Sequence, residues 1–151
     1  MTALTTACAA LLANLSSLPS WPDGLGLENL RRRRVNALSV DVACWRESVR
    51  QADEYLGDDG MESPRTYLHE ATIRIELSVT GSEAGARAVI DNCLSEAGST
   101  IDGNLQLGAL VNDVRAAGVE FDFADSSEAG HGFHSATLTI LIDYHSTNPF
   151  I

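Results

Sequence analysis

The sequence predicts an α+β domain: a small antiparallel or mixed sheet of about four strands with helices packed on one face, in the order α-β-β-α-β-β. Four segments alternate apolar and polar residues with the period of two that is typical of half-buried strands. Two other segments repeat apolar residues at three- and four-residue spacing, which is typical of helices with one buried face. With 151 residues, of which 44% are hydrophobic, the chain is expected to form a single domain over residues 1–151.

The first predicted element is a helix over about residues 2–18. Pro19 and Pro22, with Gly24 and Gly26 behind them, end this helix and begin a linker over residues 19–30, because proline cannot continue a helix. The sheet and a second helix are then expected over about residues 35–147. The apolar stripe of the first helix consists of Leu4, Cys8, Leu11, Leu12, Leu15 and Leu18.

The first strand is expected where apolar residues alternate with Ser39, Asp41 and Ala43; they are Leu38, Val40, Val42 and Cys44. The polar segment that follows is expected to hold one helical turn around Ser48–Tyr55 and a loop tip at Gly57–Gly60. The second strand is the clearest in the chain, since the segment from Thr72 to Val79 alternates without interruption.

A helix is expected from Glu83 to Ala97, with Ser82 as its N-cap and Gly98 as its end. Its apolar face comprises Ala86, Val89, Ile90, Cys93, Leu94 and Ala97. A turn-rich interval and the apolar segment Leu105–Val111 lead to a third strand over Val119–Phe123, whose Val119, Phe121 and Phe123 are expected to point inward. The fourth strand is expected from Ala136 to His145.

The charge is unevenly distributed along the chain. The formal net charge is −11, all ten cationic side chains are arginine, and six of them lie in residues 31–50 against two acids, which makes that segment +4. Residues 51–151 hold four arginines against seventeen acids, or −13, and residues 1–30 carry −2. Stable binding of nucleic acid is not expected from so acidic a chain, because neutralising phosphates needs a surplus of cations.

The cysteines and the apolar segments bear on the compartment. Cys8, Cys44 and Cys93 are odd in number and lie in apolar patterns, so we expect buried free thiols in a reducing compartment. No apolar run reaches the roughly 18 residues that a membrane span requires. The apolar N-terminus lacks the positive leader of a signal peptide, so an unprocessed cytosolic product without membrane association is expected.

The residues offer little sign of catalysis. His131 and His134 have a spacing that suits a metal, and His145 could approach them across the hairpin, but a zinc site needs four donors or three with water. No serine lies in a nucleophile elbow and no glycine-rich loop suits a phosphate. We expect a non-enzymatic protein without cofactor or metal; a small metal-dependent enzyme that uses the histidines and nearby acids stays as an alternative.

Four arginines in a row, Arg31, Arg32, Arg33 and Arg34, precede the first strand. They could contact DNA phosphates, pair with an acidic surface of a neighbouring copy, or simply be solvated at the entry to the strand. Pairing between copies is the more economical functional interpretation, because the same chain carries seventeen acids downstream.

Several segments match a known family in order. They are the amphipathic helix Leu4–Leu18, the strand Asn36–Val42, the strand Ala71–Val79 after a polar loop that ends near Arg65, the segment Leu105–Arg115, and the C-terminal strand ending in Tyr144–Thr147. With these features the chain resembles the tail terminator, or tail completion, proteins of long-tailed phages and related gene-transfer particles. It departs from their pattern at Ala109, where a second glycine is common.

The resemblance implies a structural protein of the virion tail, assembled in the host cytoplasm. Such a protein forms a ring, usually a hexamer, at the head-proximal end of the tail tube, ends tube polymerisation and offers a joining surface to the head. Its expected partners are other copies of itself, the tail tube protein and the head connector or neck protein, and DNA passes through the ring without stable binding. A head-completion or neck protein of the same kind of particle is the alternative.

The candidate subunit or tube interface combines the arginine run with two polar loops, Gly57–Pro64 and Ala124–His134. Loops of this length more often serve contacts than packing. The candidate residues are Arg31, Arg32, Arg33, Arg34, Asp58, Asp59, Glu62, Asp125, Glu128, His131 and His134.

Overall fold

The computed structural model describes residues 3–22, 25, 33–35, 38–51, 65–108, 111–123, 132–148 and 150. Its elements are α1 (Ala3–Ser16), β1 (Arg33–Val35), β2 (Leu38–Gln51), β3 (Tyr67–Gly81), α2 (Glu83–Asp102), β4 (Asp113–Phe123) and β5 (Gly132–Ser146). The expected α+β class and the order α-β-β-α-β-β are confirmed, with the three-residue β1 as an addition before the first long strand.

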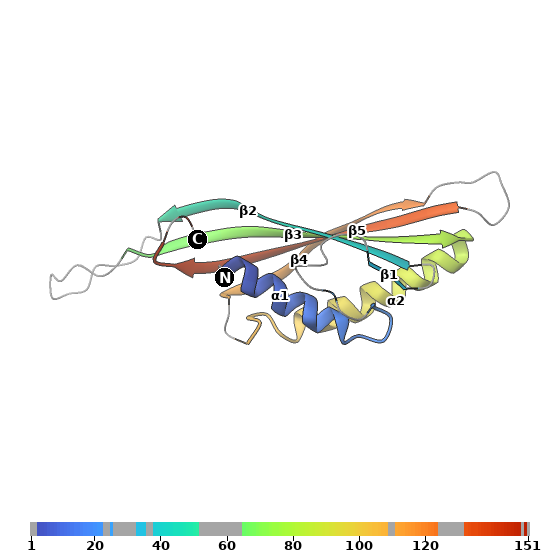
Figure 1. Ribbon diagram of the computed structural model, residues 1–151, viewed down its shortest axis with the longest axis horizontal. Coiled ribbons are helices and arrows are strands. Elements are labelled where there is room, and N and C mark those ends of the chain that lie inside the picture. Colours follow the sequence, from blue (N-terminus) through green and yellow to red (C-terminus); the bar gives the residue numbers. More distant parts are fainter. Residues whose placement is uncertain are drawn as a thin grey trace.

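The five strands form one sheet in the order β1-β2-β3-β5-β4, and every neighbouring pair is antiparallel. Both helices lie on the same face and run along the length of the strands (Figure 1). A strand of 14 or 15 residues extends about 45–50 Å, so the described part of the molecule is elongated. The sheet is strongly twisted, so that β2 and β4 cross each other in the view of Figure 1.

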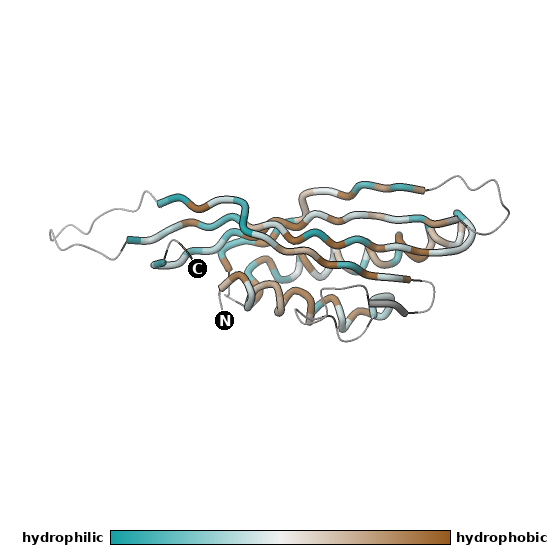
Figure 2. The backbone as a smooth tube through the Cα atoms, turned by 45° about the horizontal axis from the view of Figure 1, so that its top comes forward, coloured by the Kyte–Doolittle hydropathy of each residue, from teal (hydrophilic) through white to brown (hydrophobic). Residues whose placement is uncertain are grey.

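The core fills the space between the helices and one face of the sheet. Apolar and polar residues alternate along the strands (Figure 2), and the apolar residues of β3 and β5 point to the helices. From the sheet, the fully buried members include Val40, Ala71, Ile73, Ile75, Leu77, Val114, Ala136, Ile140 and Ile142; from the helices, they include Ala7, Leu11, Leu12, Leu15, Ile90 and Cys93. The opposite face of the sheet has no helix over it among the described residues.

The turn after α1 is fixed to α2. The Trp21 indole, 4% exposed, donates from Nε1 to the carbonyl oxygen of Cys93 at 3.0 Å. The amide and the hydroxyl of Ser20 donate to the two oxygens of the Glu96 carboxylate at 3.0 and 2.9 Å. These bonds hold the two helices together on the sheet. The expected helix end before Pro19 is confirmed.

The expectation of three free thiols was wrong for two of them. Cys8 of α1 and Cys44 of β2 form a disulfide, with 7.4 Å between their Cα atoms. The two cysteines lie far apart in sequence but face each other because α1 packs on the side of the sheet to which Cys44 points. Cys93 is free and buried.

The second helix begins as expected but continues further. Ser82 is the N-cap, and its hydroxyl oxygen accepts from the amide of Gly85 at 3.1 Å. Gly98 was expected to end the helix and does not; the helix runs through it to Asp102 and is capped by Gly103. The extra turn buries Ile101, and this burial offsets the roughly 1 kcal/mol that a glycine costs inside a helix.

All four long strands extend beyond their expected bounds, and in β2 and β4 the extension lies past a bulge. The helical turn expected around Ser48–Tyr55 is wrong for residues 48–51, where β2 continues to Gln51 past an irregularity between Arg46 and Ser48; residues 52–55 lie outside the described residues. Likewise β4 starts at Asp113, with an irregularity between Ala116 and Gly118. A bulge shifts the alternation by one residue and hides a strand from a period-of-two pattern.

The inward orientation expected for the third strand is only half right. By register, Val119, Phe121 and Phe123 lie opposite Leu138, Ala136 and His134, on the helix side of the sheet. However, β4 is an edge strand, and Val119 and Phe121 remain 39% and 52% exposed. Only Phe123 is half-buried, beneath the guanidinium of Arg87, whose Cζ lies 3.9 Å from the ring centroid.

Candidate functional site

Most of the predicted interface residues lie outside the part of the chain that the structure describes. Arg33 and Arg34 belong to β1, where their backbones pair with Val40 and Ser39. Thus the arginine run leads into an edge of the sheet. Six acidic or histidine candidates and two arginines are not described: Arg31, Arg32, Asp58, Asp59, Glu62, Asp125, Glu128 and His131.

His134 is not the surface residue that the sequence suggested. It is 2% exposed on the helix side of β5, and its Nε2 lies 3.2 Å from the carbonyl oxygen of Gly81. Residues 132–134 are part of the strand, so the expected loop Ala124–His134 is wrong for these three residues, and residues 124–131 lie outside the described part of the chain. Burial on the helix side removes His134 from any surface contact.

The expected approach of His145 to the histidine pair is also wrong. His134 and His145 lie on the same strand, eleven residues and about 36 Å apart, and they point to opposite faces. Among the described residues, no three His, Cys, Asp or Glu side chains gather in a way that could hold a metal ion. The described residues therefore give the metal-enzyme alternative no support.

Polar side chains gather around the buried His69 on the helix side of the sheet, near the C-terminal end of β5. His69 is fully buried and stacks on Tyr144, with 4.7 Å between ring centroids. The Arg46 guanidinium lies 3.4 Å from Nδ1, so Nδ1 accepts, and Nε2 donates to the Ser146 hydroxyl at 2.8 Å. That hydroxyl donates in turn to the carbonyl of Asn148 at 2.6 Å.

Ser146 and His69 are not arranged as a catalytic serine and its general base. The Ser146 hydroxyl proton points to a carbonyl and away from the imidazole, and the second imidazole nitrogen faces a cation where a catalytic dyad places a carboxylate. Burial lowers the pKa of His69 below its ordinary value, and the charge of Arg46 lowers it further. Burial also raises the pKa of Tyr144. The cluster thus holds the end of β5 in place around a neutral histidine.

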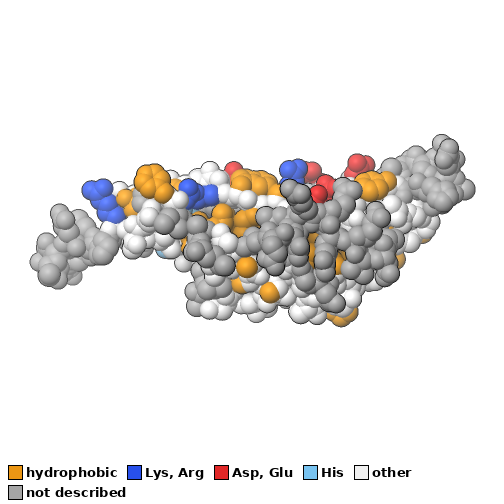
Figure 3. Space-filling view, viewed as in Figure 1, with side chains coloured by type: hydrophobic (Ala, Val, Ile, Leu, Met, Phe, Trp, Pro, Cys, Tyr) orange, Lys and Arg blue, Asp and Glu red, His pale blue; other side chains and the backbone are white. Residues whose placement is uncertain are grey.

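The helix-free face of the sheet is polar and mostly acidic. Strand alternation and register place eight carboxylates and three guanidinium groups of the four long strands on this face, a net charge of −5. In the view of Figure 3, the described charged side chains line the upper rim, on the side of the sheet away from the helices. The residues are Asp41, Glu47, Glu70, Glu76, Asp113, Glu120, Asp122 and Asp143, with Arg50, Arg74 and Arg115.

The charges are not spread evenly over this face. Asp41 and Glu76 lie directly opposite each other on β2 and β3, and Glu120 of β4 is in the same cross-strand row, separated from Glu76 by Thr137. Like charges directly opposite in a sheet are destabilising. The fold therefore tolerates an unfavourable row of carboxylates on a face that no helix covers.

One of the three arginines is already neutralised. The Arg115 guanidinium contacts Asp143 at 2.7 Å and Asp113 at 3.2 Å, and hydrogen bonds to these carboxylates raise its pKa. Near the middle of the same face, the Trp45 indole and the Thr72 hydroxyl both donate to Glu47, the latter at 3.0 Å. Trp45 is 37% exposed, so the face also offers aromatic surface at this point.

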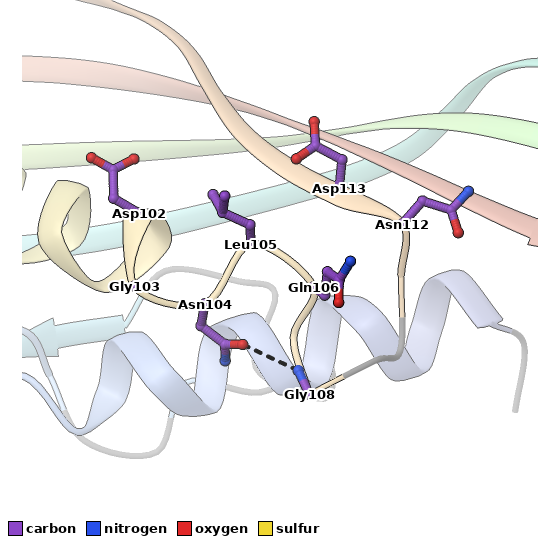
Figure 4. A pocket seen from close by; sticks show the side chains of 8 residues that line it. All are labelled: Asp102, Gly103, Asn104, Leu105, Gln106, Gly108, Asn112 and Asp113. Atoms are coloured by element: carbon purple, nitrogen blue, oxygen red, sulfur yellow. Dashed lines mark hydrogen bonds between the residues drawn. The ribbon is translucent and has the colours of Figure 1, made fainter.

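A shallow pocket lies where the chain passes from α2 to β4. Its volume is about 480 Å³. The side-chain Oδ1 of Asn104 accepts from the amide of Gly108 at 3.1 Å, and Asp102 and Asp113 stand on either side of Leu105 (Figure 4). Leu107 and Gly108 have φ values of 46° and 67°, so the turn uses the left-handed region twice. Among the described residues, the pocket is lined by Asp102, Gly103, Asn104, Leu105, Gln106, Gly108, Asn112 and Asp113, which include no serine, cysteine or histidine.

Neither the acidic face nor the strand edges of the sheet could be recognised as loops or charge runs in the sequence. The carboxylates of the acidic face are single residues on alternate positions of four strands. A signal did exist: the polar positions between Ile73 and Val79 include Arg74 and Glu76, and those after Val119 are Glu120 and Asp122. Charges at every second position of a strand predict a face in water.

No helix in the described part of the chain is long and apolar enough to cross a membrane. No protein-family model matches the chain, and no curated protein sequence matches it.

Proposed function

We propose that this protein is a structural component of a phage-type particle that forms a ring at the head-proximal end of the tail tube. In this role it ends polymerisation of the tube and offers a surface for joining the head. The proposal starts from the resemblance of the chain to tail terminator proteins. The observation that carries it is the architecture of the sheet, in which helices cover one face, while the other has no helix over it among the described residues and is net negative.

An uncovered acidic face suits the lining of a channel for DNA. Six copies would carry about −30 on this face, from −5 on each, and like charge keeps the phosphate backbone from adhering to the wall. Partly exposed hydroxyl side chains of β5 lie between the charges on this face; they are Ser135, Thr137 and Thr139.

The charge distribution also supports contacts between unlike surfaces of neighbouring copies. Residues 31–50 are +4 and residues 51–151 are −13. A patch that attracts a different patch on the next copy produces a head-to-tail arrangement, and such an arrangement closes into a ring when the rotation allows it.

The function is tested with the tube protein of the same particle. Purified tube protein is allowed to polymerise with increasing amounts of this protein, and tube length is measured by negative-stain electron microscopy. A terminator shortens the tubes in proportion to its concentration and is found at one end only. Tubes of unchanged length, with the protein bound to head connector instead, would assign it to the neck of the particle. Binding to neither would refute both assignments.

A further inference from the structure

The sheet has two long strand edges without a partner among the described residues. β4 is paired only with β5, and β2 is paired on its outer side only at Leu38–Val40, by β1. The free stretches, residues 41–51 of β2 and 113–123 of β4, are equal in length. We propose that β4 of one subunit pairs with the free edge of β2 in the next, so that the sheet continues from copy to copy. The inference rests on the proposed ring and identifies its subunit junction.

Strand directions fit this pairing. Along the sheet the four long strands alternate: β2 and β5 run one way, β3 and β4 the other. A second copy rotated about an axis parallel to the strands keeps these directions. Its β2 therefore runs opposite to β4 of the first copy, and the alternation continues without a break. Such a head-to-tail contact uses two different edges and generates a ring, and backbone pairing at exposed edges is a common mode of association.

The short strand β1 determines the register of the junction. Within one subunit, Phe121 lies level with Ala136, Leu77, Val40 and Arg33, so β1 occupies the outer edge at the height of residues 121–123. A neighbour docked without stagger would bring the end of β4 against β1. β4 must therefore pair further along the neighbour's β2, toward the C-terminal end of that strand. A closed sheet requires such a stagger between its strands.

A stagger of about four residues satisfies three conditions together. An even shift keeps every side chain on its own face of the sheet. It moves Glu120 away from the neighbour's Asp41, which it would directly oppose without stagger, and places it next to the exposed Trp45. It also places Phe121 beside the half-buried Cys44 on the helix side.

The junction explains the exposed apolar residues of β4. Val119 and Phe121 are 39% and 52% exposed on the helix side, where neither α1 nor α2 covers them. An edge strand with exposed apolar residues invites association unless a partner covers it.

Cross-linking tests the junction directly. The double variant E120C/W45C places one thiol on each edge, both on the helix-free face, and the native cysteines do not interfere, since two are bonded and Cys93 is buried. A short bifunctional maleimide should then give a denaturing-gel ladder that extends beyond the dimer, up to six copies. Each single variant should stay monomeric on the same gel.

The outcomes separate the junction from the ring. A ring-sized particle without a ladder would overturn the strand pairing and leave the ring standing. Dimers from E120C alone would show that β4 pairs with itself, which contradicts the head-to-tail junction. A monomer in solution, both alone and with tube protein, would overturn the proposed ring and the junction together.

A surface variant provides the second readout. F121K should abolish the ring-sized species while the circular dichroism spectrum and the unfolding midpoint stay near wild type. The matched control is F133K, because Phe133 is similarly exposed, at 49%, but points to the other face from β5. Equal loss of assembly by both variants would contradict the proposed junction.

Discussion

Glu76 offers a test of the charged face, because replacing it should stabilise the protein. Its backbone lies directly opposite Asp41, and neither carboxylate has an ion pair within 4 Å among the described residues. Two unit charges about 6 Å apart in water repel by about 0.7 kcal/mol, and physiological salt reduces this by roughly half. E76Q removes the repulsion and keeps the acceptor for the Ser78 hydroxyl, which donates to Glu76 at 3.3 Å.

The expected gain is about 0.3–0.7 kcal/mol, which corresponds to a rise of about 1–2 °C in Tm for a domain of this size. Thermal unfolding is followed at low salt and again at about 1 M NaCl, where the difference should vanish because surface charges are screened. The double variant D41N/E76Q should gain little more than either single variant, since each removes the same repulsion.

A second Glu→Gln substitution serves as the control with the opposite sign. Glu83 lies in the first turn of α2 and accepts from Arg87 at 2.8 Å. E83Q should therefore destabilise by about 0.3–1 kcal/mol, because it removes an ion pair and a favourable charge at a helix N-terminus. If E76Q lowers Tm as E83Q does, or raises it equally at high salt, the reasoning about the acidic row is wrong.

Three further predictions concern the core. The folded-state pKa of His69 is lowered, so the free energy of unfolding, measured with urea, should fall as the pH falls below about 6.5. H69Q should remove this part of the pH dependence. An identical pH profile for H69Q would contradict the buried neutral imidazole. W21F should cost about 1–3 kcal/mol in the same assay, because it removes the indole hydrogen bond to the Cys93 carbonyl and part of a buried ring. A cost near zero would show that the turn does not depend on this side chain. Non-reduced protein unfolded in denaturant should show one free thiol per chain with Ellman's reagent, and three thiols would contradict the disulfide. In the native state Cys93 should react slowly at about pH 8, because burial raises its pKa to about 12.

The parts of the fold that could be predicted are those where one period runs without interruption. The alternation from Thr72 to Val79 identifies β3, and the leucine spacing from Leu4 to Leu15 identifies α1. Both work because one face of each element is buried against a continuous core. The order of the elements and the one-sided packing of the helices follow from these patterns.

The parts that could not be predicted depend on contacts distant in sequence. A bulge hides the second half of β2, and only the pairing of residues 48–51 with residues 67–70 of β3 identifies it as strand. Gly98 reads as a helix end, but the burial of Ile101 against the sheet carries α2 one turn further. From the sequence, His134 is expected to be a surface residue beside a glycine. In the structure it pairs with Val79, and this pairing points its side chain into the core.

The candidate site shows the same division. The acidity of the chain and the arginine run are visible in the sequence. Their arrangement is not, because whether Glu120 lies beside Thr137, and Thr137 beside Glu76, depends on the strand order β3-β5-β4. That order cannot be read from a chain in which β3 and β5 are separated by a helix and another strand.

The most direct test of the account is the mass of the purified protein in solution, by light scattering after size-exclusion chromatography, alone and with added tube protein. The account predicts a ring of six 16.1 kDa chains, about 97 kDa, that dissociates in F121K and persists in F133K. A protein that stays at 16.1 kDa under both conditions would contradict it.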